Sequence, residues 1–456
     1  MSEQVQKPKI LVARAIFPDI LARLEQVADV QSNQDDRLWD AADLKAAMAN
    51  KDAAIVTGGE RVDADILKAS PQLKIVSNIA VGYNNFDMAA FSAANVMATN
   101  TPDVLTDTTA DFGFALLMAT ARRVTESEHW LRAGNWKKFS IYDTPLSMDI
   151  HHSTLGIMGM GRIGQAIARR ARGFNMNVKY YNRSRLSPDL EKECGATYVD
   201  RDTLLKESDH IILVMPYTPE NHHLFGEKEL NMMKPTATLV NIARGGIVDE
   251  LALAKALKDN KIFAAGIDVF EGEPKVNPGL LKLQNVVLTP HLGASTLEAQ
   301  ENVALEAAQL LADFLLRGQV SNAVNMAAVN PAELADARPY VDLARRLGLM
   351  QAQIAQGVVR KATLSYRGEL AGQKTKLLTA AFTAGLLEYR LSEGVNLVNA
   401  EFLARERGIE LAESSSPKKG DFAALLHTEV ETEQGTTVAS GTLFGDQYVR
   451  LVQLGP

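Results

Sequence analysis

Residues 155–171 read LGIMGMGRIGQAIARRA and place three glycines, Gly159, Gly161 and Gly164, between an apolar run and an amphipathic helix. The apolar run 155–158 predicts a buried strand, and the apolar residues after Gly161 recur at helical spacing. We expect Gly159 to turn the chain, Gly161 to let a pyrophosphate approach the backbone, and Gly164 to pack helix on strand. Free N–H groups at the start of a helix suit a phosphate anion, so the stretch predicts a dinucleotide-binding turn.

The end of the next strand, VKYYN, bears on which dinucleotide binds. An acidic side chain there would bind the ribose hydroxyls, but this chain has Asn182, followed by Arg183 and Ser184, with no carboxylate before Asp189. The missing acid removes repulsion against a 2′-phosphate, and the arginine and the hydroxyl supply donors for it. The sequence therefore favours NADP(H) and leaves NAD(H) possible, with a solvated turn as the alternative reading.

Three chemically active residues follow downstream: Arg244 in NIARGGIVDE, Glu273 in DVFEGEP and His291 in TPHLGAS. Each lies in or just after an apolar segment that predicts a parallel strand, and these segments are residues 238–243, 264–270 and 286–289. The ligand crevice of an open α/β sheet lies at the carboxyl ends of its strands. Singly these residues would more often be surface residues, but behind a dinucleotide turn they predict an active site.

With these loops the chain resembles the D-isomer-specific 2-hydroxyacid dehydrogenase family, over about residues 8 to 325. Reducing a 2-keto acid adds a hydride to the carbonyl carbon and a proton to its oxygen, and the nicotinamide carries only the hydride. The resemblance implies that His291 gives the proton and that Glu273 pairs with the other ring nitrogen. It also implies that Arg244 holds the substrate carboxylate and stabilises charge on the carbonyl oxygen.

Other stretches refine the resemblance. TPDVLTDTTADFGFALL (101–117) resembles glyoxylate/hydroxypyruvate reductases, and SNIAVGYNNFD (77–87) and DIHHSTLGIMGMGRIG (149–164) resemble the bacterial branch that also reduces 2-ketogluconate. The resemblance implies that the backbone N–H groups of Val81 and Gly82 bind the substrate carboxylate, although a plain turn is the alternative for Gly82. Further cofactor contacts are implied at Thr109, Arg162, Ile163, Pro216, Thr218, Ile242, Ala243, Asp268 and Gly293; Thr109 could instead cap a helix.

The last 130 or so residues predict a further domain, with helical patterns at 343–356 and 375–391. Strand patterns cover KATLSYRGEL (361–370) and parts of 421–454. RGELAG, LVNAEFLARERGIE and SGTLFG resemble the intervening, effector-binding domain of long-form phosphoglycerate dehydrogenases. We expect this domain to act in assembly or in sensing an anion.

The expected fold is α/β, with two Rossmann-like or flavodoxin-like lobes built on parallel sheets and a C-terminal α+β domain. The substrate-binding lobe is expected at 1–103 and 297–325, the dinucleotide-binding domain at 104–296, and the C-terminal domain at 326–456. The family implies an active site in a cleft between the two lobes.

Composition fits an enzyme of about three domains: 456 residues, 46% of them hydrophobic. A net charge of −7 gives no general attraction for nucleic acid. No apolar run reaches membrane-spanning length, the start MSEQVQKPK lacks a signal-peptide core, and the single Cys194 fits a reducing compartment. We therefore expect a cytoplasmic homodimer or homotetramer with no nucleic-acid or membrane partner, and we expect no metal site.

Three functions remain open. The first is an NADPH-dependent reductase of glyoxylate, hydroxypyruvate or 2-ketogluconate. The second is a D-3-phosphoglycerate dehydrogenase of serine biosynthesis. The C-terminal domain and PHLGAST (290–296) favour this function, and Asn182 disfavours it. Lys137 and Lys138 are candidate contacts for its substrate phosphate. The third is a binding protein on the same fold that senses the nicotinamide state.

Overall fold

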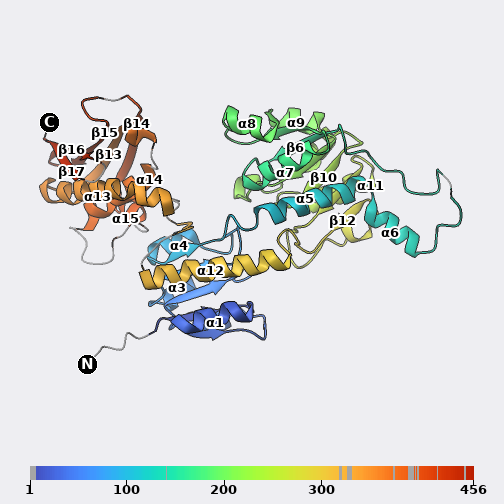
Figure 1. Cartoon of the computed structure of the whole chain (residues 1–456), viewed down its shortest axis with the longest axis horizontal. Coiled ribbons are helices and arrows are strands. Elements are labelled where there is room, and N and C mark those ends of the chain that lie inside the picture. The colour runs from blue at the N-terminus through green and yellow to red at the C-terminus, as the bar shows by residue number, and fades with distance from the viewer. Residues whose placement is uncertain are drawn as a thin grey trace. The chain divides into compact units, whose positions relative to one another are not determined.

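The computed structural model describes residues 7–139, 141–317, 321–325, 331–372, 375–388, 395, 397, 400–418, 420–445 and 448–455, without the side chains of 331–336 and 402. The chain forms two compact units, one of Met1–Pro102 with Glu301–Pro456 and one of Asp103–Gln300. Figure 1 traces them along the chain by colour.

The N-terminal part of the first unit is built on a five-stranded parallel sheet in the order β2-β1-β3-β4-β5. This is the flavodoxin-like order. The strands are β1 (Lys9–Val12), β2 (Asp29–Ser32), β3 (Ala53–Val56), β4 (Ile75–Asn78) and β5 (Met97–Thr99). Every residue of β3 and β4 is buried, as expected where helices cover both faces of a parallel sheet.

The helices of this part are α1 (Pro18–Val27), α2 (Ala41–Met48), α3 (Ala64–Ala69) and α4 (Met88–Ala93). Aspartate side chains begin three of them, because Asp40, Asp63 and Asp87 accept hydrogen bonds from backbone N–H groups of the first turn. The long helix α12 (Leu297–Arg317) returns to this sheet, where Ala304, Ala307, Ala308 and Leu311 join its core.

The second unit contains a seven-stranded parallel sheet in the order β12-β11-β10-β9-β6-β7-β8. Its strands are β6 (Thr154–Met158), β7 (Asn177–Tyr181), β8 (Ala196–Tyr198), β9 (His210–Leu213), β10 (Thr238–Asn241), β11 (Ala264–Ile267) and β12 (Val286–Leu288). The order of strands reverses between β6 and β9, and in doubly wound folds the ligand binds at such a reversal. The predicted dinucleotide turn follows β6 directly.

Helices cover both faces of this sheet, and two hydrophobic clusters form its core. The helices are α5 (Thr106–Ala121), α6 (Val124–Arg132), α7 (Arg162–Arg172), α8 (Pro188–Cys194), α9 (Arg201–Glu207), α10 (Glu227–Met232) and α11 (Glu250–Lys258), with short 3₁₀ turns η1 (Pro219–Asn221) and η2 (Leu280–Lys282). The two parallel lobes confirm the α/β fold class expected from the sequence.

The C-terminal residues form a mixed sheet in the order β14-β13-β15-β16-β17, in which β13 pairs with β14 in parallel and the other pairs are antiparallel. Its elements are α13 (Pro331–Ile354), β13 (Val359–Gly368), η3 (Glu369–Gly372), α14 (Thr375–Glu388), α15 (Ala400–Glu406), β14 (Glu410–Ser416), β15 (Ala424–Thr432), β16 (Gly435–Phe444) and β17 (Tyr448–Leu454). Helices α13 and α14 pack together, and α13 packs on the sheet (Figure 1). This confirms the expected α+β class.

Details of this region differ from the sequence prediction. Helix α13 begins at Pro331, well before residue 343. The helix predicted for 375–391 is described as α14 as far as Glu388, and residues 389–391 lie outside the described part. Within the described residues, no helix is long and apolar enough to cross a membrane.

Candidate active site

The glycine turn after β6 has the backbone geometry that its sequence predicts. Gly159 has φ +101°, and a Cβ there would lie 2.6 Å from the backbone nitrogen of Met215. A Cβ on Gly164 would lie 2.2 Å from the carbonyl oxygen of Gly159, so neither position has room for a side chain. A Cβ on Gly161, in contrast, would meet nothing within 4 Å. The space at Gly161 is open, as the approach of a pyrophosphate requires.

The start of α7 offers unpaired donors beside that space. Gly161 precedes the helix without a side-chain cap, and within the described residues the N–H groups of Gly161 and Arg162 have no hydrogen-bond acceptor. These groups, with the positive end of the helix dipole, fit a phosphate anion. The Arg162 side chain forms an ion pair with Asp103, at 2.8 Å from Nε to the carboxylate.

Asn182 stands at the end of β7, but its side chain acts within the turn. Its Oδ1 accepts a hydrogen bond from the backbone N–H of Met160 at 3.0 Å. The next residues, Arg183 and Ser184, are exposed and form no hydrogen bond with any residue in the described ranges. They are therefore the polar side chains at this strand end that remain available to a ligand.

Arg185 belongs to a separate local structure. Its Nε and Nη2 donate hydrogen bonds to the Glu191 carboxylate, each at 2.8 Å, and its guanidinium lies 5.9 Å from the centre of the Tyr198 ring. The hydrogen bonds from Arg185 and from the Tyr180 hydroxyl lower the pKa of Glu191 to about 2. Burial, together with the bond to Glu191, raises the pKa of Tyr180 to about 12. Arg185 is therefore already paired.

Glu273 and His291 meet directly, although they come from loops after different strands. Nδ1 of His291 lies 2.9 Å from Oε2 of Glu273, and Oε1 of Glu273 accepts the N–H of Phe270 at 2.8 Å. Burial raises the pKa of Glu273, but the hydrogen bonds from His291 and Phe270 and the charges of His291 and Arg244 outweigh it, so this pKa lies below its usual range. An ionised carboxylate only accepts, so Nδ1 of His291 is the donor and Nε2 is left for another partner.

Arg244 follows β10 in a loop that Asn241 shapes. The Asn241 side chain accepts the N–H of Ala243 at 3.0 Å and donates to the carbonyl oxygen of Arg244 at 3.1 Å. Nη1 of Arg244 donates to the carbonyl oxygen of Ala243 at 2.7 Å, which uses one of the five guanidinium donors. Burial lowers the pKa of Arg244 and the charge of Glu273 raises it, so the two groups are near enough to interact.

Asp268, which is 1% exposed, holds the loop of His291. Its carboxylate accepts hydrogen bonds from the hydroxyl of Thr289 at 2.8 Å and from the N–H groups of Leu292 at 2.7 Å and Gly293 at 3.0 Å. Its carbonyl oxygen accepts the N–H of His291, whose φ is +55°. Burial raises the pKa of Asp268 in spite of these bonds. The carboxylate is thus used inside the protein and fixes the position of His291.

Gly293 and Thr109, two further residues of the implied cofactor site, lie close to Asp268. A Cβ on Gly293 would lie 3.5 Å from both the Thr109 methyl group and the Asp268 carboxylate. Ile242 and Ala243, at the end of β10, are 7% and 6% exposed. Pro216 and Thr218 follow β9, where the Asn221 side chain binds the carbonyl oxygen of Pro216 and the N–H of Thr218. Ile163 lies in the first turn of α7.

In the first unit, three carbonyl groups of the loop 79–83 after β4 are held by hydrogen bonds. The oxygen of Ala80 accepts the N–H of Thr101 at 3.1 Å. The oxygens of Val81 and Gly82 accept the side-chain amides of Asn100 at 2.6 Å and Asn78 at 2.7 Å. Among the described residues, no acceptor meets the N–H groups of Val81 and Gly82. Two adjacent N–H groups of this kind on a fixed loop make the loop a candidate site for an anion.

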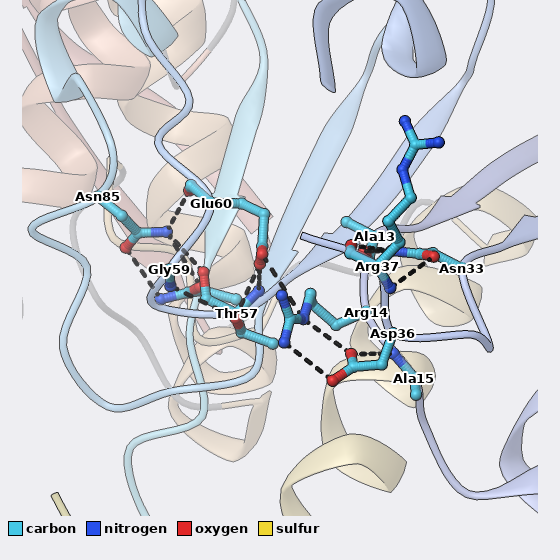
Figure 2. A network of polar contacts seen from close by, with 11 residues as sticks. Ala13, Arg14, Ala15, Asn33, Asp36, Arg37, Thr57, Gly59, Glu60 and Asn85 are labelled. Atoms are coloured by element: carbon cyan, nitrogen blue, oxygen red, sulfur yellow. Dashed lines mark hydrogen bonds and ion pairs between the residues drawn. The ribbon is translucent and has the colours of Figure 1, made fainter. Parts of the chain in front are cut away.

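A polar network at the carboxyl ends of β1 to β4 supports this loop (Figure 2). Asn78 meets Asn85 at 3.3 Å, and the Asn85 amide donates to the carbonyl oxygens of Thr57 and Glu60, each at 3.0 Å. The Glu60 carboxylate accepts from the N–H and the hydroxyl of Thr57, each at 2.8 Å. Arg14 lies between Asp36 and Glu60, with its Nε 2.9 Å and 3.9 Å from their carboxylates.

Sequence reasoning missed the roles of Asn78, Asn100 and Asp268. Asparagines after strands were available as a signal, because their side chains can bind backbone groups of nearby turns. The identity of the carbonyl groups that they hold depends on contacts between segments that are separate in the sequence.

Two family models match the chain. Residues 114–293 match the D-isomer specific 2-hydroxyacid dehydrogenase NAD binding domain, and residues 336–455 match the D-3-phosphoglycerate dehydrogenase intervening domain. The glyoxylate reductase of Thermococcus onnurineus is 46% identical over 311 residues, which cover 68% of this chain and 93% of the relative. The D-3-phosphoglycerate dehydrogenase of Methanocaldococcus jannaschii is 36% identical over 415 residues, 90% of this chain and 77% of the relative.

Solved structures agree. The NADPH-dependent glyoxylate/hydroxypyruvate reductase of Sinorhizobium meliloti, in complex with NADP and malonate, superposes with a TM-score of 0.62 at 32% identity, covering 70% of this chain and 97% of that one. A glyoxylate reductase from Paecilomyes thermophila gives 0.64 at 32% identity, covering 70% and 98%. The chain therefore belongs to the D-isomer specific 2-hydroxyacid dehydrogenases, a family of nicotinamide-dependent oxidoreductases.

Proposed function

We propose that this chain is a reductase of small 2-keto acids, with glyoxylate and hydroxypyruvate as the first candidates and 2-ketogluconate as a third. The observation that carries the proposal is the hydrogen bond of 2.9 Å between His291 and Glu273, in the same unit as the glycine turn. It is an acid–base pair in which one ring nitrogen is oriented and the other has no partner among the described residues, as proton transfer to a carbonyl oxygen requires. Relatives named as glyoxylate reductases support the substrate class.

Two candidate groups for the substrate carboxylate are taken each within its own unit: Arg244 in the second unit, and the N–H groups of Val81 and Gly82 in the first. The loop N–H groups have no acceptor among the described residues, and the Arg244 guanidinium keeps donors beyond the one bound to Ala243. A planar guanidinium can donate two parallel hydrogen bonds to a carboxylate, which fixes orientation as well as charge. These groups would select 2-keto acids over uncharged carbonyl compounds.

His291 would then hold a proton on Nε2 and give it to the carbonyl oxygen. Glu273 keeps the imidazole in one orientation through its contact with Nδ1. Arg244 stabilises the negative charge that develops on the carbonyl oxygen. When bound, the nicotinamide cofactor supplies the hydride.

We further propose that NADPH is preferred to NADH. Gly161 and the start of α7 fit the pyrophosphate, and the end of β7 has no carboxylate to repel a 2′-phosphate. Arg183 and Ser184 are exposed and available to bind it. The complex of the Sinorhizobium meliloti reductase with NADP supports the same choice.

One set of kinetic measurements tests these assignments. Initial rates with glyoxylate, hydroxypyruvate, 2-ketogluconate and 3-phosphohydroxypyruvate, each with NADPH and with NADH, give the substrate and cofactor preference. His291→Gln is expected to lower kcat by about a hundredfold or more while cofactor binding is kept. His151→Gln, which changes an exposed histidine that pairs with Asp149, is the matched control. Near-normal turnover of His291→Gln would remove His291 from the mechanism.

Arg244→Lys provides an independent test of carboxylate binding. An ammonium group is a point charge and cannot reproduce two parallel hydrogen bonds, so we expect a higher KM and a lower kcat. Unchanged values of both constants would contradict the role given to Arg244.

A second candidate function is D-3-phosphoglycerate dehydrogenase. Its support is the match of residues 336–455 to the intervening domain of those enzymes, together with the alignment over 90% of this chain to the Methanocaldococcus jannaschii enzyme. Of the two lysines considered as phosphate contacts, Lys138 lies 3.6 Å from the Asp143 carboxylate. A higher kcat/KM for 3-phosphohydroxypyruvate than for the unphosphorylated keto acids would favour this function.

We also propose that the protein assembles as a homodimer or homotetramer. Helix α6 and the chain after it expose several large apolar side chains, and large exposed apolar patches mark interaction surfaces. They are Val124, Leu131, Trp136, Phe139, Ile141, Tyr142 and Leu146. Sedimentation of the full chain and of a chain ending at Asn325 would show whether the C-terminal domain adds to this assembly.

A further inference from the structure

Two histidines outside the catalytic set converge on one carboxylate. His222 and His223 follow η1, and Glu271 follows β11. Nε2 of His223 lies 3.1 Å from Oε2 of Glu271, and Nε2 of His222 lies 3.7 Å from Oε1. One potential ligand atom from each of the three residues lies within 4.8 Å of the others. We call these residues the His-His-Glu cluster.

The rings of the two histidines lie close together. The two imidazoles stack with centroids 3.9 Å apart and an interplanar angle of 21°. Nδ1 of His222 lies 3.3 Å from the Tyr217 hydroxyl. If this nitrogen carries the proton and donates to the phenol oxygen, Nε2 of His222 keeps its lone pair, and such a second contact is what orients a metal-binding histidine.

The backbone around the cluster is also fixed. The N–H of His223 donates to the carbonyl oxygen of Gly246 at 2.7 Å, and His223 has φ +53°. The N–H of Glu271 donates to the carboxylate of Glu250 at 2.7 Å. These bonds fix the backbone at His223 and Glu271, which lowers the ordering cost of binding.

We propose that the His-His-Glu cluster binds a divalent transition metal ion, with Zn²⁺ as the reference ion. Bonds of about 2.1 Å in a tetrahedral site place neighbouring ligand atoms about 3.4 Å apart. Here the two Nε2 atoms lie 3.1 Å and 3.7 Å from different oxygens of Glu271, and one ligand atom from each residue lies within 4.8 Å of the others, so rotation of the side chains would close the site around an ion. Two imidazole nitrogens select Zn²⁺, Ni²⁺ or Cu²⁺ over Mg²⁺, which prefers oxygen ligands. The side chains are 42%, 37% and 44% exposed, so water can complete the coordination.

The site lies beside both catalytic loops of the second unit. Gly246, which binds His223, is two residues after Arg244, and Glu271 is two residues before Glu273. A metal ion in the cluster would therefore tie the segment after β9 to the loops that carry the guanidinium and the carboxylate. It would stabilise the fold without taking part in hydride or proton transfer.

Calorimetric titration of the full chain with ZnCl₂, after removal of metal with a chelator and dialysis, tests the proposal. We expect one ion per chain, and at least tenfold weaker binding in Glu271→Gln and in His222→Gln, since changes to groups around metal ligands alone reduce affinity ten- to a hundredfold. Co²⁺ should give visible d–d absorption in the wild type that both variants lose. MgCl₂ should give no comparable binding.

The chain offers a matched control in His151 and His152. These neighbouring histidines have centroids 5.2 Å apart, and His151 lies 3.8 Å from Asp149, but they are not among the groups that could hold a metal ion in the described residues. The double variant His151→Gln, His152→Gln should bind Zn²⁺ as the wild type does. Circular dichroism in the absence of metal checks that each variant is folded.

Three results would overturn the proposal. They are the absence of Zn²⁺ binding at millimolar concentration, equal affinity in the wild type and in a folded Glu271→Gln or His222→Gln variant, and loss of binding in the His151, His152 control. The first would leave the cluster as polar contacts between the two histidines and Glu271. None of these measurements involves substrate or cofactor, so they stand apart from the proposed activity.

Discussion

Replacement of Asn182 by aspartate should reverse the cofactor preference with little change in the fold. Asn182 contributes Oδ1 to the turn by accepting the N–H of Met160 at 3.0 Å, and a carboxylate keeps that acceptor. What changes is the other atom, because the amide nitrogen becomes a charged oxygen at the end of β7. The carboxylate would repel the 2′-phosphate of NADPH and accept hydrogen bonds from the ribose hydroxyls of NADH.

The size of the effect follows from Coulomb's law. Two unit charges roughly 5 Å apart at an effective dielectric constant of about 40 interact by about 1.7 kcal/mol. A phosphate monoester carries about 1.5 to 2 negative charges at neutral pH, so Asn182→Asp should weaken NADPH binding by about 2 to 3 kcal/mol, or about 30- to 150-fold. The ratio of kcat/KM for NADPH to that for NADH should fall by at least this factor.

A pair of arginine variants provides the control. Arg183 is exposed and unpaired by hydrogen bonds among the described residues, so Arg183→Gln should lower kcat/KM for NADPH by about tenfold and leave NADH unaffected. Arg185 is already bound to Glu191, so Arg185→Gln should leave the cofactor ratio unchanged. The reasoning would be refuted by an unchanged ratio in Asn182→Asp, or by equal effects of the two arginine variants.

Three further predictions concern stability. Asp268→Asn leaves one of the three donors that now bind the buried carboxylate without an acceptor, so the free energy of unfolding in urea should fall by about 1 to 3 kcal/mol. The kcat should fall as well, and wild-type values for both quantities would contradict the role of Asp268 in holding the His291 loop. The folded pKa of Glu191 is lowered to about 2 from 4.5, so the stabilisation by its carboxylate is present above about pH 4.5 and is lost as the pH falls toward 2. The difference in unfolding free energy between the wild type and Glu191→Gln should therefore narrow over that interval, and a constant difference would contradict this role of Glu191. A chain ending at Asn325 should fold, since the Asn325 side chain binds the backbone of Val96 and Ala98. A chain ending at Arg317 lacks this contact and should melt at a lower temperature, and equal melting temperatures of the two chains would contradict its importance.

The strongest local patterns of the sequence predicted the main strands of the second unit and the turn from β6 to α7. The glycine motif predicted the passage from β6 to α7, and the apolar segments before Arg244, Glu273 and His291 predicted β10, β11 and β12. These strands are buried on both faces, so their residues are apolar almost without interruption. Short strands were missed: β2 is four residues long with every residue partly or fully exposed, and β5 has three residues, too few for a clear pattern.

The site could be predicted in its residue types and only partly in its contacts. The meeting of Glu273 with His291 follows once both loops stand at the same edge of the sheet. The Asn182 side chain, in contrast, accepts the N–H of Met160, and the strand pattern around Asn182 does not show this contact with a residue 22 positions earlier. The His-His-Glu cluster could not be found by spacing, since Glu271 is 48 residues from His223 and comes from another loop.

The hydrogen bonds to the carbonyl groups of Ala80, Val81 and Gly82 determine when the loop 79–83 loses its conformational freedom. Because the backbone N–H of Thr101 and the side chains of Asn100 and Asn78 already hold these groups, the entropy of ordering the loop is lost during folding and not when a ligand arrives. An anion therefore meets donors that need no rearrangement. Weakening of the contacts from Asn78 or Asn100 should accordingly make the loop mobile in the free protein, and part of the binding energy would then be used to order it again.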